Sequence, residues 1–261
     1  MKVQDFGVFE GPLVLFGGVY SNLQALEALI SAVGDRPAIC TGDVVAYCAD
    51  AASSVSLIRE TGWPVVAGNC ETQIAEEAPD CGCGFEDGSA CDVLSLGWYP
   101  RALSQIDAEG RTWMAGLPDV GIFRHEGLRY GVVHGGATRN NRFLWPTSEA
   151  SDFLEEAEAL EAMIGHVDGI IGGHSGIGFQ RKVGRWHWIN AGAIGLPPHD
   201  GRRETRYAVL DRDGATLERL SYDAESARAA MLDAGMVGGY ADTLLSGIWP
   251  SEDVLPTALR R

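Results

Sequence analysis

Residues 38–71 read AICTGDVVAYCADAASSVSLIRETGWPVVAGNCE, and this stretch decides the fold class. Its two short apolar runs, 38–40 and 64–67, lead into Thr-Gly-Asp and Gly-Asn, which is typical of buried strands that end in a loop. A helical segment that starts at Ser53 or Ser54 separates the two runs. The order of strand, loop, helix and strand predicts right-handed crossovers in a sheet with parallel strands, and therefore an α/β fold.

The flanking sequence continues the same alternation. Leu13–Phe16 predicts a further strand, and Ser21 or Asn22 can cap the helix that follows it. We expect helices near 107–115, from Thr147 or Ser148 to about 164, and from Ala224 onward, followed by a loose tail. The remaining strands are expected at 120–123, 128–133, 169–171, 179–183, 185–189, 207–210 and 216–221. Residues 79–92 (PDCGCGFEDGSACD) have no apolar period and predict an irregular Cys-rich loop insertion in a single domain over 1–261.

Composition excludes several classes of partner. The 261 residues include 36 acidic and 20 basic side chains, so the formal net charge of -16 argues against duplex nucleic acid and against an anionic membrane. No apolar stretch approaches the roughly 18 residues of a spanning helix. Asp5 and Glu10 interrupt the N-terminal apolar residues, which are too few for a signal peptide. We therefore expect a globular cytoplasmic protein.

Four polar residues share one position in this pattern. Asp43, Asn69, His134 and His174 each follow a short apolar strand and lie beside a glycine. Ligands gather at the carboxyl ends of strands in such sheets, so the four side chains are expected to converge. A carboxylate, an amide and two imidazoles suit Mn, Fe or Zn. Any one of them alone would be read as a capping or core polar group, but the set of four indicates a metal site.

The segments around these residues resemble the motifs of the calcineurin-like metallophosphoesterases, especially the small bacterial group that is similar to diadenosine tetraphosphatases. The matching segments are Gly18-Val19-Tyr20-Ser21-Asn22, Gly42-Asp43, Gly68-Asn69-Cys70-Glu71, His134-Gly135, Gly173-His174-Ser175-Gly176, WINAGAIGLP at 188–197, and Arg206-Tyr207-Ala208-Val209. The resemblance extends from Leu13 to about Leu210. It implies a four-layer α/β/β/α sandwich with two mixed β-sheets and a metal centre.

The resemblance also implies an activity, namely metal-dependent hydrolysis of a phosphomonoester or phosphodiester in a small phosphorylated substrate. Family members hold two metal ions, and the ligand set that corresponds to one of them is complete here: Asp43, Asn69, His134 and His174. The other set is largely missing, because Gly18, Tyr20 and Gly176 stand where the family has Asp, His and His. Cys70 replaces the family's histidine that stabilises the transition state. We assign Asp43, Cys70 and His174 to catalysis and expect one or two divalent ions.

The cysteines suggest how the missing ligand set could have been rebuilt. All six precede residue 92, and thiolates bind Zn or Fe well. The candidate second metal site consists of Tyr20, Cys48, Cys70, Cys81, Cys83 and Cys91. The alternatives are that the loop cysteines form a structural staple or a separate zinc knot, and that Tyr20 donates a hydrogen bond or fills space. Cys40 lies inside a strand and is assigned to the core.

Three further residues are candidates for phosphate binding: Arg139, Asn140 and His199. The run around Arg139 is alternatively a solvated loop. Two non-enzymatic functions remain open at this point. The chain could be a degenerate phosphoesterase-fold protein that binds a nucleotide or a partner, or a module that senses metal or redox state.

Overall fold

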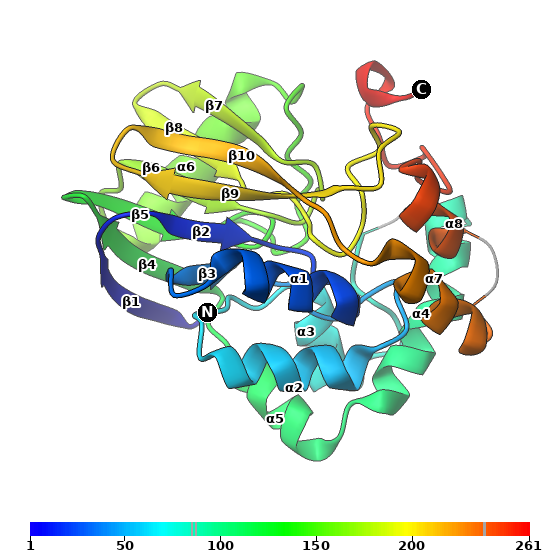
Figure 1. Ribbon diagram of the computed structural model, residues 1–261. Helices are drawn as coiled ribbons and strands as arrows, with labels where there is room; N and C mark the ends of the chain where they lie inside the picture. The colour runs from blue at the N-terminus through cyan, green and yellow to red at the C-terminus, as the bar shows by residue number, and fades with distance from the viewer. Residues whose placement is uncertain (85, 87, 237–238) are drawn as a thin grey trace.

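The computed structural model describes residues 1–84, 86, 88–236 and 239–261, in which two β-sheets pack between helices (Figure 1). The six-stranded sheet has the order β1-β4-β5-β6-β8-β7, and the four-stranded sheet has the order β10-β9-β2-β3. The larger sheet contains β1 (Val3–Phe9), β4 (Val120–His125), β5 (Leu128–Val132), β6 (Gly169–Gly172), β8 (Trp186–Asn190) and β7 (Phe179–Val183). The smaller sheet contains β10 (Gly214–Leu220), β9 (Thr205–Asp211), β2 (Leu13–Phe16) and β3 (Ala38–Cys40).

Three apolar clusters define the layers. Between the sheets, Leu15 of the smaller sheet and Ile171 of the larger one belong to the same buried cluster. On the outer face of the larger sheet, α6 (Ala150–Ile164) buries Leu160 in a cluster that includes Trp188. The helices associated with the smaller sheet are α1 (Leu23–Val33), α2 (Ala51–Thr61), α3 (Asn69–Ala75), α4 (Ala90–Gln105), α5 (Ala108–Gly116), α7 (Ala224–Asp233) and α8 (Tyr240–Ser246). The expected four-layer α/β/β/α sandwich with two mixed sheets is confirmed.

Parallel pairing places the ends of the central strands together. β2 runs parallel to β3 in the smaller sheet, and β6 runs parallel to both β5 and β8 in the larger one. Just beyond β5 and β6, the Gly173 N–H donates to the His134 carbonyl over 2.6 Å. The loops that carry the predicted ligands therefore leave the sheets side by side.

Two segments differ from the strands predicted by sequence. Residues 64–67 form only an isolated parallel bridge between Cys40 and Val65, and the chain then turns into α3 at Asn69. Conversely, Val3–Phe9 forms the unexpected edge strand β1, which pairs parallel with β4. Most of this strand is exposed, and it therefore lacks the continuous apolar pattern of a buried strand.

The Cys-rich insertion and the C-terminal tail also differ from expectation. The insertion ends before residue 92 because Ser89 caps α4 by accepting a hydrogen bond from the Asp92 N–H. Positions 85 and 87 of the predicted loop lie outside the described residues. The tail is not loose throughout, since it contains α8 and a 3-10 turn at Thr257–Leu259. Helix α2 begins at Ala51, slightly before the predicted serines.

Within the described ranges, none of the helices has both the length and the apolar character required to cross a membrane.

Candidate metal centre

Asp43 lies in the loop after β3, in a backbone conformation that its neighbours impose. The φ angle of Asp43 is 54°, and that of the preceding Gly42 is 94°. A Cβ atom at Gly42 would lie 2.6 Å from the Gly68 nitrogen, so only glycine permits the two loops to approach this closely. The turn places the Asp43 carboxylate beside the loop that carries Asn69.

Glu71 holds this pair of loops together, and the sequence analysis gave it no role. Its buried carboxylate accepts hydrogen bonds from the N–H groups of Asp43 at 2.7 Å and Gly68 at 2.9 Å through Oε2, and from Val45 at 3.2 Å through Oε1. Burial and the adjacent Asp43 raise the pKa of Glu71 to about 7. Its position directly after Gly-Asn-Cys in the motif was the signal that could have identified it.

Asn69, in the first turn of α3, presents its side-chain oxygen to the site. Its Nδ2 donates to the Cys81 carbonyl over 2.9 Å, which fixes the orientation of the amide. The Oδ1 atom consequently faces Nε2 of His134 at 3.1 Å. The Cys-rich loop therefore orients a metal-ligand candidate through its backbone.

His134 occupies the centre of the group. Its Nδ1 lies 2.6 Å from the Thr41 carbonyl, to which it donates, so that Nε2 points toward the other candidates. Nε2 lies 3.1 Å from Asp43 Oδ2 and 3.1 Å from His174 Nδ1. Among the described residues, Asp43, His134 and His174 form a group whose ligand atoms all lie within 4.8 Å of one another.

The donor set fits a divalent cation. With Nδ1 of His134 donating to a carbonyl, a neutral ring directs the lone pair of Nε2 at the oxygens of Asp43 and Asn69. Such facing lone pairs repel one another in a buried site unless a proton or a metal ion lies between them. Within the described part of the chain, His174 Nε2 is also buried without a hydrogen-bond partner. Carboxylate, amide and imidazole ligands suit Mn, Fe or Zn.

The pKa values of these residues are shifted by their burial and by their short distances to one another. Burial lowers the pKa of His134, but the adjacent Asp43 carboxylate outweighs it and raises the pKa above its ordinary value. Burial and the neighbouring His134 lower the pKa of His174 to about 3. Burial opposes ionisation of Asp43, yet the two histidines lower its pKa overall. The pKa of Asp43 and the pKa of His134 are therefore shifted in the directions expected of an ion pair.

An aromatic ring fills the space around Gly18 and Gly176, two positions where the sequence resemblance implies ligands of the other metal ion. A Cβ atom at Gly18 would lie 2.5 Å from Cζ of Tyr20 and 2.7 Å from Cβ of Ala193. A Cβ atom at Gly176 would lie 3.5 Å from the Tyr20 hydroxyl. Burial and Asp43 raise the pKa of Tyr20 well above its ordinary value, so the ring carries a neutral phenol. Tyr20 therefore occupies the space into which side chains at positions 18 and 176 would extend.

Three of the predicted cysteine ligands gather on the far side of Asn69, and two do not. Asn69 Nδ2 lies 3.3 Å from Cys83 Sγ and 3.5 Å from Cys70 Sγ, and the Cys81 thiol contacts Cys83. Contact with Cys83 lowers the pKa of Cys70, but burial and Asp43 raise it overall, so the buried thiol is neutral. The group of close ligand atoms found in the described residues contains no cysteine. A thiolate metal site stays a prediction.

The other cysteines point elsewhere. Cys48 Sγ lies 4.0 Å from the Gly195 carbonyl, and Cys91 contacts the side chain of Ser251. Cys40 is fully buried in β3, where the sequence placed it in the core. The six cysteines are all free thiols.

The candidate phosphate-binding residues lie in different surroundings. Arg139 is exposed and Asn140 is half-buried in the loop after His134. His199 is buried, its Nε2 donates to Glu252 Oε1 over 2.8 Å, and its Nδ1 accepts from the Trp249 N–H over 2.8 Å. Both ring nitrogens therefore hold the C-terminal segment, and in this arrangement neither is available to a phosphate.

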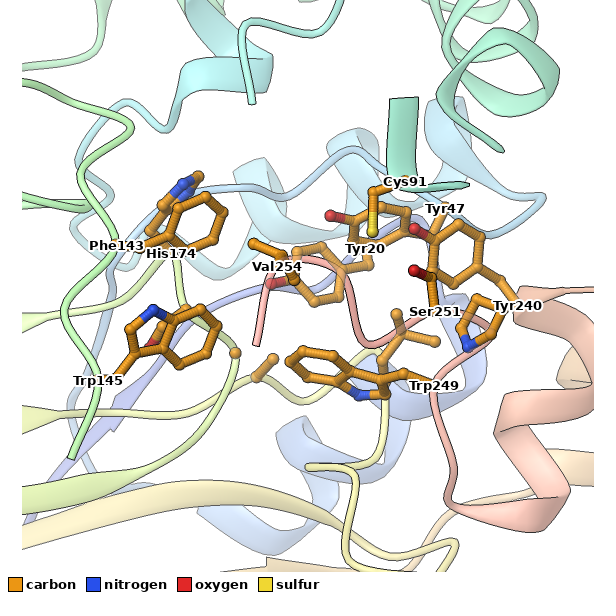
Figure 2. A pocket seen from close by; sticks show the side chains of 15 residues that line it. Tyr20, Tyr47, Cys91, Phe143, Trp145, His174, Tyr240, Trp249, Ser251 and Val254 are labelled. Carbon is orange, nitrogen blue, oxygen red and sulfur yellow. The ribbon is translucent and has the colours of Figure 1, made fainter. Parts of the chain in front are cut away.

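A cleft opens beside His174, with about 500 Å³ of empty space that is partly open to solvent (Figure 2). The sequence analysis gave no role to the tryptophans, Tyr47 or Tyr240, so it did not anticipate this cleft. Its lining residues are Tyr20, Tyr47, Cys91, Phe143, Trp145, His174, Ser175, Gly176, Ala193, Leu196, Tyr240, Trp249, Pro250, Ser251 and Val254.

Comparison with known proteins identifies structures that share the fold of this chain. A metallophosphoesterase from Sphaerobacter thermophilus superimposes with a TM-score of 0.72 and 20% identity, covering 92% of this chain and 100% of its own. A hypothetical protein from Pyrococcus horikoshii OT3 gives a TM-score of 0.74 and 14% identity, with coverage of 92% and 99%. An uncharacterised protein of Methanocaldococcus jannaschii is 24% identical over 236 residues, which is 82% of this chain and 89% of that protein.

No family model matches the sequence. The two solved structures nevertheless share the fold of this chain over 92% of its length. The chain therefore has the fold of the calcineurin-like metallophosphoesterases, as its motifs implied.

Proposed function

We propose that the protein is a metal-dependent phosphoesterase that works with a divalent ion held by Asp43, Asn69, His134 and His174. The observation that carries this proposal is the convergence of lone pairs around His134 Nε2 at 3.1 Å from Asp43, Asn69 and His174. Four ligand candidates from four separate segments of the chain meet there in a buried position. The metallophosphoesterase fold supports the same conclusion.

The chain's own residues position the reaction. The Cys70 N–H donates to Asp43 Oδ1 over 3.3 Å, which leaves Oδ2 directed at the site. Glu71 fixes the loops of Asp43 and Asn69, and Thr41 fixes the ring of His134. A bound divalent ion would polarise the phosphoryl group and make hydroxide available near neutral pH. Because the side chains are already oriented, little reorganisation is required when substrate binds.

The proposal requires one metal ion per chain, at the site formed by Asp43, Asn69, His134 and His174. Tyr20 fills the space of the family's other ligand set, so the electrostatic stabilisation that a second ion would provide is reduced. Turnover is consequently expected to be slower than in two-metal relatives. A rebuilt site that uses Cys70, Cys81 and Cys83 remains the alternative source of a second ion.

The proposal is tested with purified protein, aryl phosphate mono- and diesters, and added Mn²⁺ or Zn²⁺. Asp43→Asn should lose bound metal and lower kcat/KM by at least about a hundredfold, because a charged ligand is removed. Asp35→Asn, on an exposed turn, is the matched control and should behave like the wild type. Equal hydrolysis by the wild type and Asp43→Asn would show that the chain is not a phosphoesterase of this kind and would favour the non-catalytic binding role.

A further inference from the structure

We propose that the guanidinium groups of Arg206 and Arg219 form a binding site for a small oxyanion of the phosphate class, at the rim of the space between the two β-sheets. The shared chemistry of the ligand is that of inorganic phosphate and of the phosphoryl group of an organic phosphate. Neither arginine is among the candidate metal ligands or the residues that line the cleft beside His174. The inference therefore concerns a separate site and does not depend on the proposed hydrolysis.

The two arginines lie directly opposite each other on adjacent strands. Arg219 of β10 is the partner of Arg206 of β9 in an antiparallel pair, and Figure 1 shows the two strands side by side. Like charges at directly opposite positions repel each other and destabilise the pairing of two strands. A negative group bound beside the two guanidiniums reduces this repulsion.

Both side chains leave their strands on the face that is turned toward the larger sheet. Residues two positions apart on a strand share a face, and Ala208 and Leu217 pack in the apolar cluster between the sheets. Arg206 precedes Ala208 near the start of β9, and Arg219 follows Leu217 near the end of β10. A Cβ atom at Gly192, just after β8 of the larger sheet, would lie 3.0 Å from Cβ of Arg206. The two arginines therefore lie at the rim of the space between the sheets.

The two guanidiniums are partly buried but can be reached from solvent. The side chains of Arg206 and Arg219 are 26% and 27% exposed. The carbon stem of an arginine covers apolar surface while its charged end reaches water. Partial burial lowers the effective dielectric constant, so the attraction of an anion to these groups is stronger than at a fully exposed arginine.

The carboxylate of Asp200 lies beside both guanidiniums and satisfies them only in part. Its Oδ2 accepts a hydrogen bond from Nη2 of Arg219. The same oxygen lies 3.8 Å from Nη2 of Arg206, which is beyond hydrogen-bond distance. Its Oδ1 accepts from the backbone N–H of Arg202 over 3.2 Å. Asp200 therefore holds the two charged groups near each other and leaves donors on both for a further acceptor.

One of these donors is buried. Among the described residues, Nη1 of Arg219 is inaccessible to solvent and has no hydrogen-bond partner. A buried donor of a charged group without an acceptor costs free energy, so native proteins generally provide one. The planar fork of a guanidinium matches two oxygens of a phosphate group, with which it forms short, charge-assisted hydrogen bonds. An oxyanion at this rim would supply the missing acceptor.

The local charge is positive, in contrast to the formal net charge of -16 of the whole chain. The charged side chains that act on Arg206 are Arg219, Asp200, Arg202 and Glu204. Burial and the neighbouring Arg219 lower the pKa of the Arg206 guanidinium, and the two carboxylates oppose this only in part. Three guanidiniums and two carboxylates leave an excess of one positive charge, which attracts an anion to this rim.

The test measures the binding of sulfate and of inorganic phosphate by isothermal titration calorimetry. The full chain carries Asp43→Asn and is kept in chelator, so that no metal ion holds the anion at the candidate metal centre. In this background, Arg206→Gln and Arg219→Gln should each raise the Kd for sulfate at least about tenfold, because charge-assisted hydrogen bonds to the anion are lost. Arg212→Gln, at an exposed position in the turn between β9 and β10, is the matched control and should leave the Kd unchanged.

Thermal denaturation provides a second readout and also checks that each variant is folded. A ligand that binds only the folded state stabilises it. Sulfate should therefore raise the Tm of the wild type and of Arg212→Gln by more than it raises the Tm of Arg206→Gln or Arg219→Gln. Sodium chloride at the same ionic strength is the control for general attraction of anions.

The source of the anion is decided by comparing inorganic phosphate with glycerol 3-phosphate. An equal or lower Kd for glycerol 3-phosphate assigns the site to the phosphoryl group of an organic ligand, and a higher Kd assigns it to the free ion. The inference is overturned if sulfate and phosphate show no saturable binding, if sodium chloride reproduces their effects, or if both glutamine variants bind them as the wild type does. Each of these results leaves the phosphoesterase proposal untouched, because that proposal is tested by hydrolysis at the metal centre.

Discussion

The two sides of the candidate metal centre differ in the side chains that fill them. On one side, Asp43, Asn69, His134 and His174 meet with polar atoms about 3 to 4 Å apart. On the other, the ring of Tyr20 occupies the space next to Gly18 and Gly176, and an aromatic cleft extends away from it. At one edge of the β-sandwich, polar side chains therefore gather on one side and aromatic side chains fill the other.

The largest loss of stability is expected when position 18, beside the ring of Tyr20, receives the aspartate that the family has there. Gly18→Asp should destabilise the protein by about 3 kcal/mol, because its Cβ would lie 2.5 Å from Cζ of Tyr20. Chemical denaturation would measure the loss. Tyr20→His in the same chain should restore part of the stability, and additivity of the two substitutions would show that Tyr20 does not fill this space.

The second prediction tests whether Glu71 holds the loops of the candidate metal ligands in place. Glu71→Gln should lower stability by about 2 kcal/mol and weaken metal binding about tenfold, because one of three backbone N–H groups would face an amide NH₂. Denaturation and a metal titration would measure these losses. The matched control is Glu76→Gln at an exposed position, and equal behaviour of both variants would contradict the role of Glu71.

A smaller effect concerns pH and metal removal. The raised pKa values of Glu71, about 7, and of His134 contribute stability at low pH that is lost as pH rises through those values. His174 opposes this trend only below about pH 6.5, where its unfolded form is protonated. The metal-free protein should therefore lose about 1 kcal/mol of stability between about pH 6.5 and 8.

Metal should remove this dependence on pH, because a cation beside Asp43 favours the ionised form of Glu71 and competes with the proton on His134. Thermal denaturation with and without chelator would measure it. Identical profiles for the two forms would mean that no ion binds beside these groups.

The smallest effect is expected on metal affinity, and it distinguishes Cys83, which contacts Asn69, from Cys48, which does not. Cys83→Ser should weaken metal binding a few-fold, since the thiol contacts Asn69 Nδ2 at 3.3 Å, and should leave the number of bound ions unchanged. Cys48→Ser, far from Asn69 at the Gly195 carbonyl, should have no effect. Elemental analysis would decide the matter, and loss of one of two ions in Cys83→Ser would support the rebuilt thiolate site.

The sequence by itself determined the strand ends and the residues that follow them. Buried strands have continuous apolar runs, and a polar residue beside a glycine at their end stands out locally, so Asp43, His134 and His174 could be named without coordinates. The same local reasoning grouped Asn69 with these residues, and its Oδ1 lies 3.1 Å from His134 Nε2, but the predicted strand 64–67 before it makes only a single bridge. The edge strand β1 was not predicted from the sequence, because its residues are mostly exposed and show no apolar run.

Only the tertiary structure decided the role of Glu71, the separation of the cysteines and the aromatic cleft. The cleft combines Tyr20, Tyr47, Phe143, Tyr240 and Trp249, which lie up to 229 residues apart along the chain and share no local pattern. Their proximity depends on how helices, sheets and the C-terminal segment pack. Local periodicity reports which face of an element is buried, whereas the shape of a cleft depends on which elements meet.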